Sequence, residues 1–203
     1  MRRSAILVAM IVLGACGTTS TSTAPASNPD LTTAASSPTA VTVIEETYED
    51  MGRDHLSEED AAAIIEGTLA GPDYNSDPPT SGLHASIWAA CGIYRQPIPS
   101  VMQVHSLEHG AVIIHYRPDL DPEALEQLAR ELGAHIIVAP NPAISEPVVL
   151  SAWGVLQRHA GIDLDAVREF WNRYGNEGPE RVPCPVEVDE AEAVSASRRS
   201  PSI

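Results

Sequence analysis

The composition of the chain changes sharply along its length, and this limits which part can form a packed core. Between Gly17 and Val41, 20 of 25 residues are Thr, Ser, Ala or Pro. Such a segment buries too little apolar surface to offset its conformational entropy, so we expect a flexible tether. Residues 186–203 are acidic and then rich in Ser and Arg, and we expect a disordered tail there. The sequence therefore predicts a single globular domain over residues 42–185.

The N-terminal residues have the pattern of an export signal. Two arginines precede the apolar stretch Ala5–Leu13, which is too short to span a bilayer. Residues 13–16 read Leu-Gly-Ala-Cys and resemble a bacterial lipobox. The resemblance implies a lipoprotein signal peptide over residues 1–15 and acylation of Cys16 after cleavage. We therefore expect residues 16–41 to be a lipidated tether that anchors the protein on the outer side of the bacterial cytoplasmic membrane.

The net charge excludes one class of partner. The chain contains 12 arginines, no lysine and 28 acidic residues, for a formal net charge of −16. We expect no nucleic-acid binding, because such binding needs basic groups to neutralise phosphates. Anionic lipid would also repel the chain, so we expect contact with the membrane through the lipid anchor. Protein partners are not predicted, although the eight acids within residues 45–60 could meet a basic one.

Apart from Cys16 the chain has two cysteines, Cys91 and Cys184. In an oxidising compartment such a pair usually forms a disulfide, which here would tie the end of the domain back onto its body. The alternative is that Cys91 is a nucleophile or a metal ligand.

Strand and helix patterns follow an irregular first half. Short apolar or β-branched runs predict strands, and capped amphipathic segments predict helices. The expected strands are Val41–Glu45, Ala111–Tyr116, His135–Ala139 and Val148–Trp153, and the expected helices are Glu58–Leu69 after the cap Ser57, Pro122–Leu132 and Leu164–Tyr174 after the cap Asp163. This order predicts an α+β fold with one small mixed sheet, helices on one face, and a preceding irregular region that carries histidines.

Three histidines stand in unusual local settings. His84 ends a turn that contains two prolines and a glycine, and His105 and His109 are four residues apart. In one helical turn that spacing puts both rings on the same face, where they could bind one metal ion. Together the three imidazoles would suit Zn or Cu, with Glu108 as a ligand, an orienting acceptor or a base. The alternative is that these rings only hydrogen-bond the backbone.

Two blocks of sequence carry a family resemblance. Pro-Pro-Thr-Ser-Gly-x-His at 78–84 and Val-His-Ser-Leu-Glu-His-Gly at 104–110 resemble segments of a bacterial domain-of-unknown-function family of secreted and lipid-anchored proteins. Members often carry an upstream Gly-x-x-His element, which implies that His55 is a fourth candidate ligand. Relatives with a cysteine near Cys91 often have one near Cys184. The resemblance implies no established activity.

Three functions compete. The first is a metal-binding lipoprotein that uses His55, His84, His105 and His109. The second is a zinc-dependent hydrolase in which Glu108 is the general base of a His-x-x-Glu-His string. We do not expect this enzyme, because its string normally lies on a long helix and Gly110 with a β-branched run follows at once. The third is a structural or partner-binding lipoprotein without metal.

The remaining histidines are interpreted as a core residue (His115), a strand start (His135) and a helix surface position (His159).

Overall fold

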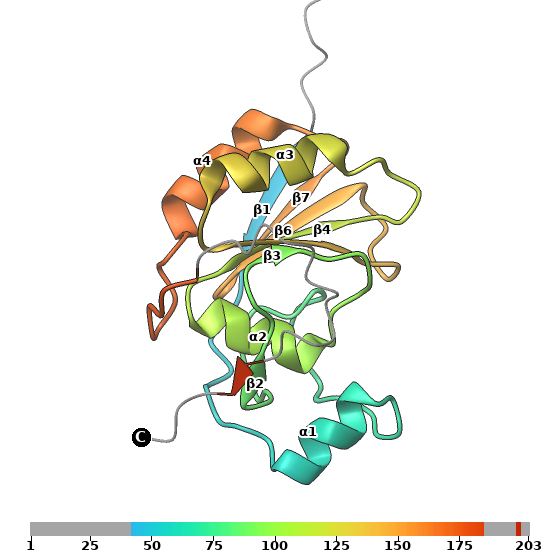
Figure 1. Cartoon of the computed structure of the whole chain (residues 1–203), viewed down its shortest axis with the longest axis vertical. Coiled ribbons are helices and arrows are strands. Elements are labelled where there is room, and N and C mark those ends of the chain that lie inside the picture. Colours follow the sequence, from blue (N-terminus) through green and yellow to red (C-terminus); the bar gives the residue numbers. More distant parts are fainter. Residues whose placement is uncertain (1–41, 185–197, 200–203) are drawn as a thin grey trace, which may run out of the picture. The chain divides into compact units, whose positions relative to one another are not determined.

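A computed structural model describes residues 42–184 and 198–199 of the chain (Figure 1). The predicted signal peptide, the lipidation site Cys16, the tether and the predicted tail except for two residues lie outside the described part. The elements are β1 (Val43–Thr47), α1 (Glu58–Ile65), β2 (Ile87–Trp88), β3 (Gly92–Ile93), α2 (Ser100–Glu108), β4 (Val112–Tyr116), α3 (Glu123–Leu132), β5 (Ile136–Pro140), β6 (Val148–Ala152), β7 (Val155–His159), α4 (Leu164–Tyr174) and β8 (Arg198–Arg199). Among the described residues, no helix is both long and apolar enough to cross a membrane.

The main sheet has six strands in the order β1-β7-β6-β4-β5-β3. β5 pairs in parallel with β4 and β3, whereas β4–β6, β6–β7 and β7–β1 are antiparallel. The sheet is therefore mixed, which confirms the predicted α+β fold. A separate antiparallel pair joins β2 and β8.

The centre of the sheet is buried on both faces. Every residue of β4, β5 and β6 is buried, in keeping with the nearly continuous apolar runs from which these strands were predicted. α3 and α4 lie along one side of the sheet, and α2 with the histidine-bearing region lies on the other (Figure 1). This second side is where the candidate site forms.

Local sequence signals set the ends of the helices on the first side. The side chain of Asp163 accepts a hydrogen bond from the amide of Ala166 and caps α4, whose bounds match the prediction. Gly133 ends α3 in the left-handed conformation, with a φ of 73°.

Some expected elements differ from the structure. α1 ends at Ile65, four residues before the predicted end at Leu69. α2 is a nine-residue helix rather than one turn. The interpretation of His159 as a helix surface position is wrong, because His159 is buried at the end of β7. That strand was missed because the turn at Trp153-Gly154, where Gly154 has a φ of 72°, folds β7 directly back onto β6.

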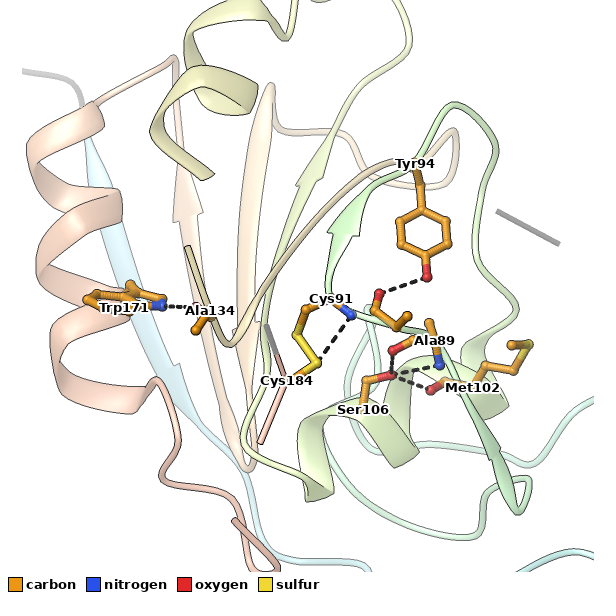
Figure 2. Close-up of a disulfide and its surroundings, with 9 residues drawn as sticks. Ala89, Cys91, Tyr94, Met102, Ser106, Ala134, Trp171 and Cys184 are labelled. Carbon is orange, nitrogen blue, oxygen red and sulfur yellow. Dashed lines mark hydrogen bonds between the residues drawn. A yellow bond between two sulfur atoms is a disulfide. The ribbon is translucent and has the colours of Figure 1, made fainter. Parts of the chain in front are cut away.

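The predicted disulfide is confirmed. Cys91 and Cys184 are bonded, with their Cα atoms 5.6 Å apart (Figure 2). The bond attaches the end of the described domain beside β3. A second link joins the same region to α2, since the amide of Ala89 donates to Ser106 Oγ at 3.0 Å (Figure 2). Cys91 is therefore neither a thiolate nucleophile nor a metal ligand in this state.

Candidate metal centre

Three separate segments bring their side chains together on the α2 side of the sheet. The backbones at His55 and His84 form a parallel bridge, in which the amide of Leu56 donates to the carbonyl of His84 at 2.7 Å. His105 and Glu108 lie three residues apart on α2 and so project from one face of that helix.

The gathered side chains are close enough to share an ion. One ligand atom each from His55, His84, His105 and Glu108 lies within 4.8 Å of the other three. The rings of His55 and His105 stack with centroids 5.1 Å apart, and the His84 ring lies edge-on to both. His84, His105 and Glu108 are buried, whereas His55 is exposed. The group is therefore a cluster of possible ligands, of which three are buried and His55 reaches solvent.

Backbone carbonyls orient two of the rings. His84 Nδ1 lies 2.7 Å from the carbonyl oxygen of Gly82, and His105 Nδ1 lies 2.6 Å from that of Ala85. A carbonyl oxygen only accepts, so both Nδ1 atoms carry the hydrogen. When such a ring is neutral, its Nε2 atom holds a lone pair directed into the group. This arrangement is usual for histidines that bind metal ions.

Burial keeps His105 neutral. Desolvation lowers the pKa of His105 to about 3, against the opposing effect of its hydrogen bond with Ala85. The ring therefore holds no second proton at neutral pH, and its Nε2 keeps the lone pair.

Glu108 is the charged centre of the group. Burial by itself raises the pKa of Glu108, but the hydrogen bond with His84 and the nearby imidazoles outweigh it and lower the pKa. Glu108 Oε2 lies 3.1 Å from His84 Nε2, and Oε1 lies 4.0 Å from the Nε of Arg53. The carboxylate is thus ionised and buried, and His84 Nε2 is its hydrogen-bond partner. Only a shared proton or a cation makes that contact favourable.

His109 lies beside this group rather than in it. Its Nε2 atom is 3.0 Å from His105 Nε2 and 3.2 Å from a carboxylate oxygen of Glu180. Desolvation lowers the pKa of His109, although Glu180 and Glu108 oppose that shift. Glu108, His109 and Glu180 form a second set whose ligand atoms lie within 4.8 Å of one another.

Two contacts around His109 were not foreseen from the sequence. The indole of Trp88 packs on His109 and His105, with ring centroids 4.9 and 5.4 Å away. Glu180 was missed because it lies in an irregular segment with no periodic pattern. The one sequence signal that could have indicated Glu180 is its position shortly before Cys184, because the predicted disulfide brings this segment back to the domain.

Comparison with known proteins identifies the family. A family model described as protein of unknown function (DUF3105) matches residues 70–186, which is more than half of the chain. The chain belongs to the DUF3105 family. This confirms the resemblance to a domain-of-unknown-function family. The DUF3105 match includes His84, His105, Glu108, His109 and both bonded cysteines, while His55 lies upstream of it. Among curated proteins and among solved structures, no match was found.

The other histidines stand apart from the two groups. His115 is buried in β4, as predicted, with its Nε2 atom 2.9 Å from Ser151 Oγ. His159 bonds to Gln157 within β7. His135 precedes β5 with a φ of 51°. Gly110 follows the C-cap of α2 in the left-handed conformation, with a φ of 87°.

Proposed function

We propose that this DUF3105 protein is a lipid-anchored extracytoplasmic protein that binds Zn or Cu through His55, His84, His105 and Glu108. The observation that carries the proposal is the convergence of three imidazoles and one buried carboxylate from three segments of the chain. Folding thereby brings an anion and lone-pair donors together in a desolvated space. A bound cation offsets the cost of that arrangement.

The donor set fits these metals. Three neutral imidazole nitrogens and one carboxylate oxygen suit Zn in tetrahedral coordination and also suit Cu. The hydrogen bonds of His84 and His105 with backbone carbonyls would hold two ligands in place before the ion arrives. The exposed His55 would be the last ligand to close on the ion.

The hydrolase alternative has weaker support. Glu108 belongs to the same close set of ligand atoms as the imidazoles, so it is placed to bind an ion rather than to activate a water at one. The helix also ends at Glu108, with His109 as its C-cap. A zinc-dependent peptidase string normally lies within a longer helix. A peptide-hydrolysis assay of the Zn-loaded protein tests this alternative directly.

The proposed location rests on two observations. The Cys91–Cys184 disulfide is typical of proteins outside the cytoplasm. The lipobox-like residues 13–16 supply the proposed anchor at Cys16. Fractionation of cells that express the wild type or Cys16→Ser tests the anchor: we expect the wild type in the membrane fraction and the variant largely released from it. Equal distribution of both would contradict lipid anchoring.

Calorimetric titration tests the metal site. The full chain, purified in detergent and stripped with a chelator, is titrated with Zn(II) and separately with Cu(II). We expect stoichiometric binding of at least one of them, and a loss of at least 100-fold in affinity for His84→Gln combined with His105→Gln, in line with the removal of two ligands. The matched control is His115→Gln, a buried histidine outside the site that should bind as the wild type does. Absence of stoichiometric binding, or unchanged binding in the double variant, would refute the proposal.

A further inference from the structure

We infer that Glu108, His109 and Glu180 form a second divalent-cation site next to the first, with Glu108 shared between the two ions. This inference rests on the proposed function, because the shared carboxylate belongs to the first site. The ligand atoms of these three residues lie within 4.8 Å of one another. The centre would therefore hold two ions rather than one.

The immediate surroundings of His109 favour a cation. His109 Nε2 contacts His105 Nε2 at 3.0 Å and Glu180 Oε2 at 3.2 Å. Because His105 donates through Nδ1 to Ala85, its Nε2 is an acceptor, and the carboxylate of Glu180 is an acceptor as well. One nitrogen of His109 thus faces two acceptors and can offer them at most one hydrogen. A divalent ion bound to His109 Nε2 and Glu180 would take the place of that single hydrogen.

The backbone holds Glu180 at this place. The amide of Glu180 donates to the carbonyl of Glu108 at 3.0 Å, and the amide of Val182 donates to that of His109 at 3.2 Å. Gly178 packs so closely that an added Cβ would lie 2.4 Å from the carbonyl oxygen of Glu108. The disulfide at Cys184 follows four residues after Glu180. A carboxylate that merely solvated the surface would need none of these restraints.

Burial and charge distinguish the two sites. His109 and Glu108 are 4% and 2% exposed, while the Glu180 side chain is 43% exposed. The second site has two carboxylates and one imidazole, against one carboxylate and three imidazoles in the first. It should therefore bind its ion more weakly and exchange it with solvent through Glu180. Two ions that share a carboxylate in proteins usually lie about 3.5–4 Å apart.

Metal stoichiometry tests the inference. The metal-free full chain in detergent is titrated with Zn(II), and the bound metal is measured by elemental analysis after gel filtration. We expect two Zn per wild-type chain and one per Glu180→Gln chain, with the tighter of the two affinities unchanged. The matched control, Glu177→Gln, alters an acid on the same segment that pairs with Arg181 and should keep two Zn.

The possible results separate the two proposals. One Zn per wild-type chain, or two in Glu180→Gln, would overturn the second site and leave the first in place. No bound Zn, together with no bound Cu(II) in the parallel titration, would overturn both.

Electron paramagnetic resonance of the Cu(II)-loaded chain gives an independent readout if Cu binds. We expect magnetic coupling between two ions in the wild type and an isolated Cu(II) signal in Glu180→Gln. Two isolated signals in the wild type would contradict a shared carboxylate.

Discussion

At the scale of single residues, the burial of His115 makes the free energy of unfolding depend on pH. It is fully buried in β4, and desolvation lowers its pKa from 6.5 to about 3. Its hydrogen bond with Ser151 satisfies the neutral ring. The unfolded chain therefore takes up a proton at this residue between pH 6.5 and about 3, whereas the folded protein does not. The stability present above pH 6.5 is lost as the pH falls through that window.

His115→Gln should make the protein less sensitive to acid. Below pH 6, removal of this histidine should reduce the pH dependence of the free energy of unfolding by about 1.4 kcal/mol per pH unit. Urea denaturation at pH 7, 5 and 4, in the presence of a chelator, measures the slope. A variant with the same slope as the wild type would show that His115 is protonated in the folded state or exposed to water.

Gly178 is required by steric contact rather than by its φ angle. A Cβ at this position would lie 2.3 Å from the amide nitrogen of Gly110 and 2.5 Å from the carbonyl oxygen of Leu107. Both contacts are with backbone, which cannot rotate away. Gly178→Ala should therefore destabilise the protein by about 1–3 kcal/mol and displace the segment that carries Glu180.

Gly71→Ala is the control for this change. Its added Cβ would meet only Ile64, at an ordinary distance of 3.7 Å. Denaturation of both variants, with metal stoichiometry measured in parallel, gives the comparison. Equal stability of the two variants would show that the 176–182 segment is not held against α2 as described.

The candidate ligands differ in how far the sequence could predict them. His105 and His109 were predicted as neighbours because their spacing matches one helical turn. That His84 would join them depends on a tertiary contact, and only the family resemblance indicated His55. Glu180 was missed, since backbone hydrogen bonds with Glu108 and His109 decide its place and only its nearness to Cys184 along the chain pointed to it.

At the scale of elements, α4 depends on its N-terminal cap. The side chain of Asp163 accepts the amide hydrogen of Ala166 at 3.0 Å, and the helix buries Val167 and Phe170 against the sheet. Asp163→Ala should lower the free energy of unfolding by about 1 kcal/mol. Asp165→Asn, in the same first turn but without a capping bond, should cost less. Urea denaturation of the two variants distinguishes capping from a general charge effect, and equal losses would favour the latter.

The disulfide fixes the segment that follows α4. It joins residues 93 positions apart and holds the chain near Glu180 and Cys184 against β3 and α2. Replacing both cysteines by serine should lower the free energy of unfolding by about 4–5 kcal/mol, according to the chain-entropy model for so long a loop. Thermal denaturation at equal pH measures the loss. A change below about 1 kcal/mol would mean that the reduced, unfolded chain keeps residual structure that already limits its freedom.

The elements found from sequence share one property. α3 and α4 show an apolar stripe beside a polar face, and β4 lies in a nearly continuous apolar run, so each is visible in the order of the apolar residues alone. α2 has no such stripe, because Val101 to Glu108 are all buried whatever their polarity. β2 and β3 are two residues long, and no periodicity can appear over that length.

At the scale of the whole molecule, the proposed ion would join the irregular region before the sheet to α2. His55 and His84 come from the irregular region before the sheet, and His105 and Glu108 come from α2. Near these two histidines the apolar packing is a small satellite cluster of Ala61, Ala85 and Val101, whereas the later residues Ala89, Cys91 and Tyr94 belong to the main core. A metal ion would therefore stabilise mainly the region that the apolar core stabilises least.

Metal loading should raise the free energy of unfolding with the logarithm of the free metal concentration, once that concentration exceeds the dissociation constant. At a free Zn(II) concentration about 100-fold above the dissociation constant, the free energy of unfolding should rise by about 2.7 kcal/mol per ion bound only by the folded state. Thermal denaturation of the full chain with Zn(II) and with a chelator measures this difference. His84→Gln combined with His105→Gln should lose the part of this difference that comes from the first ion, because its ligands are lost. His115→Gln should keep the full difference. If the wild type unfolds at the same temperature with metal and with chelator, no bound ion adds to its stability. The buried carboxylate and imidazoles would then be held together by hydrogen bonds alone.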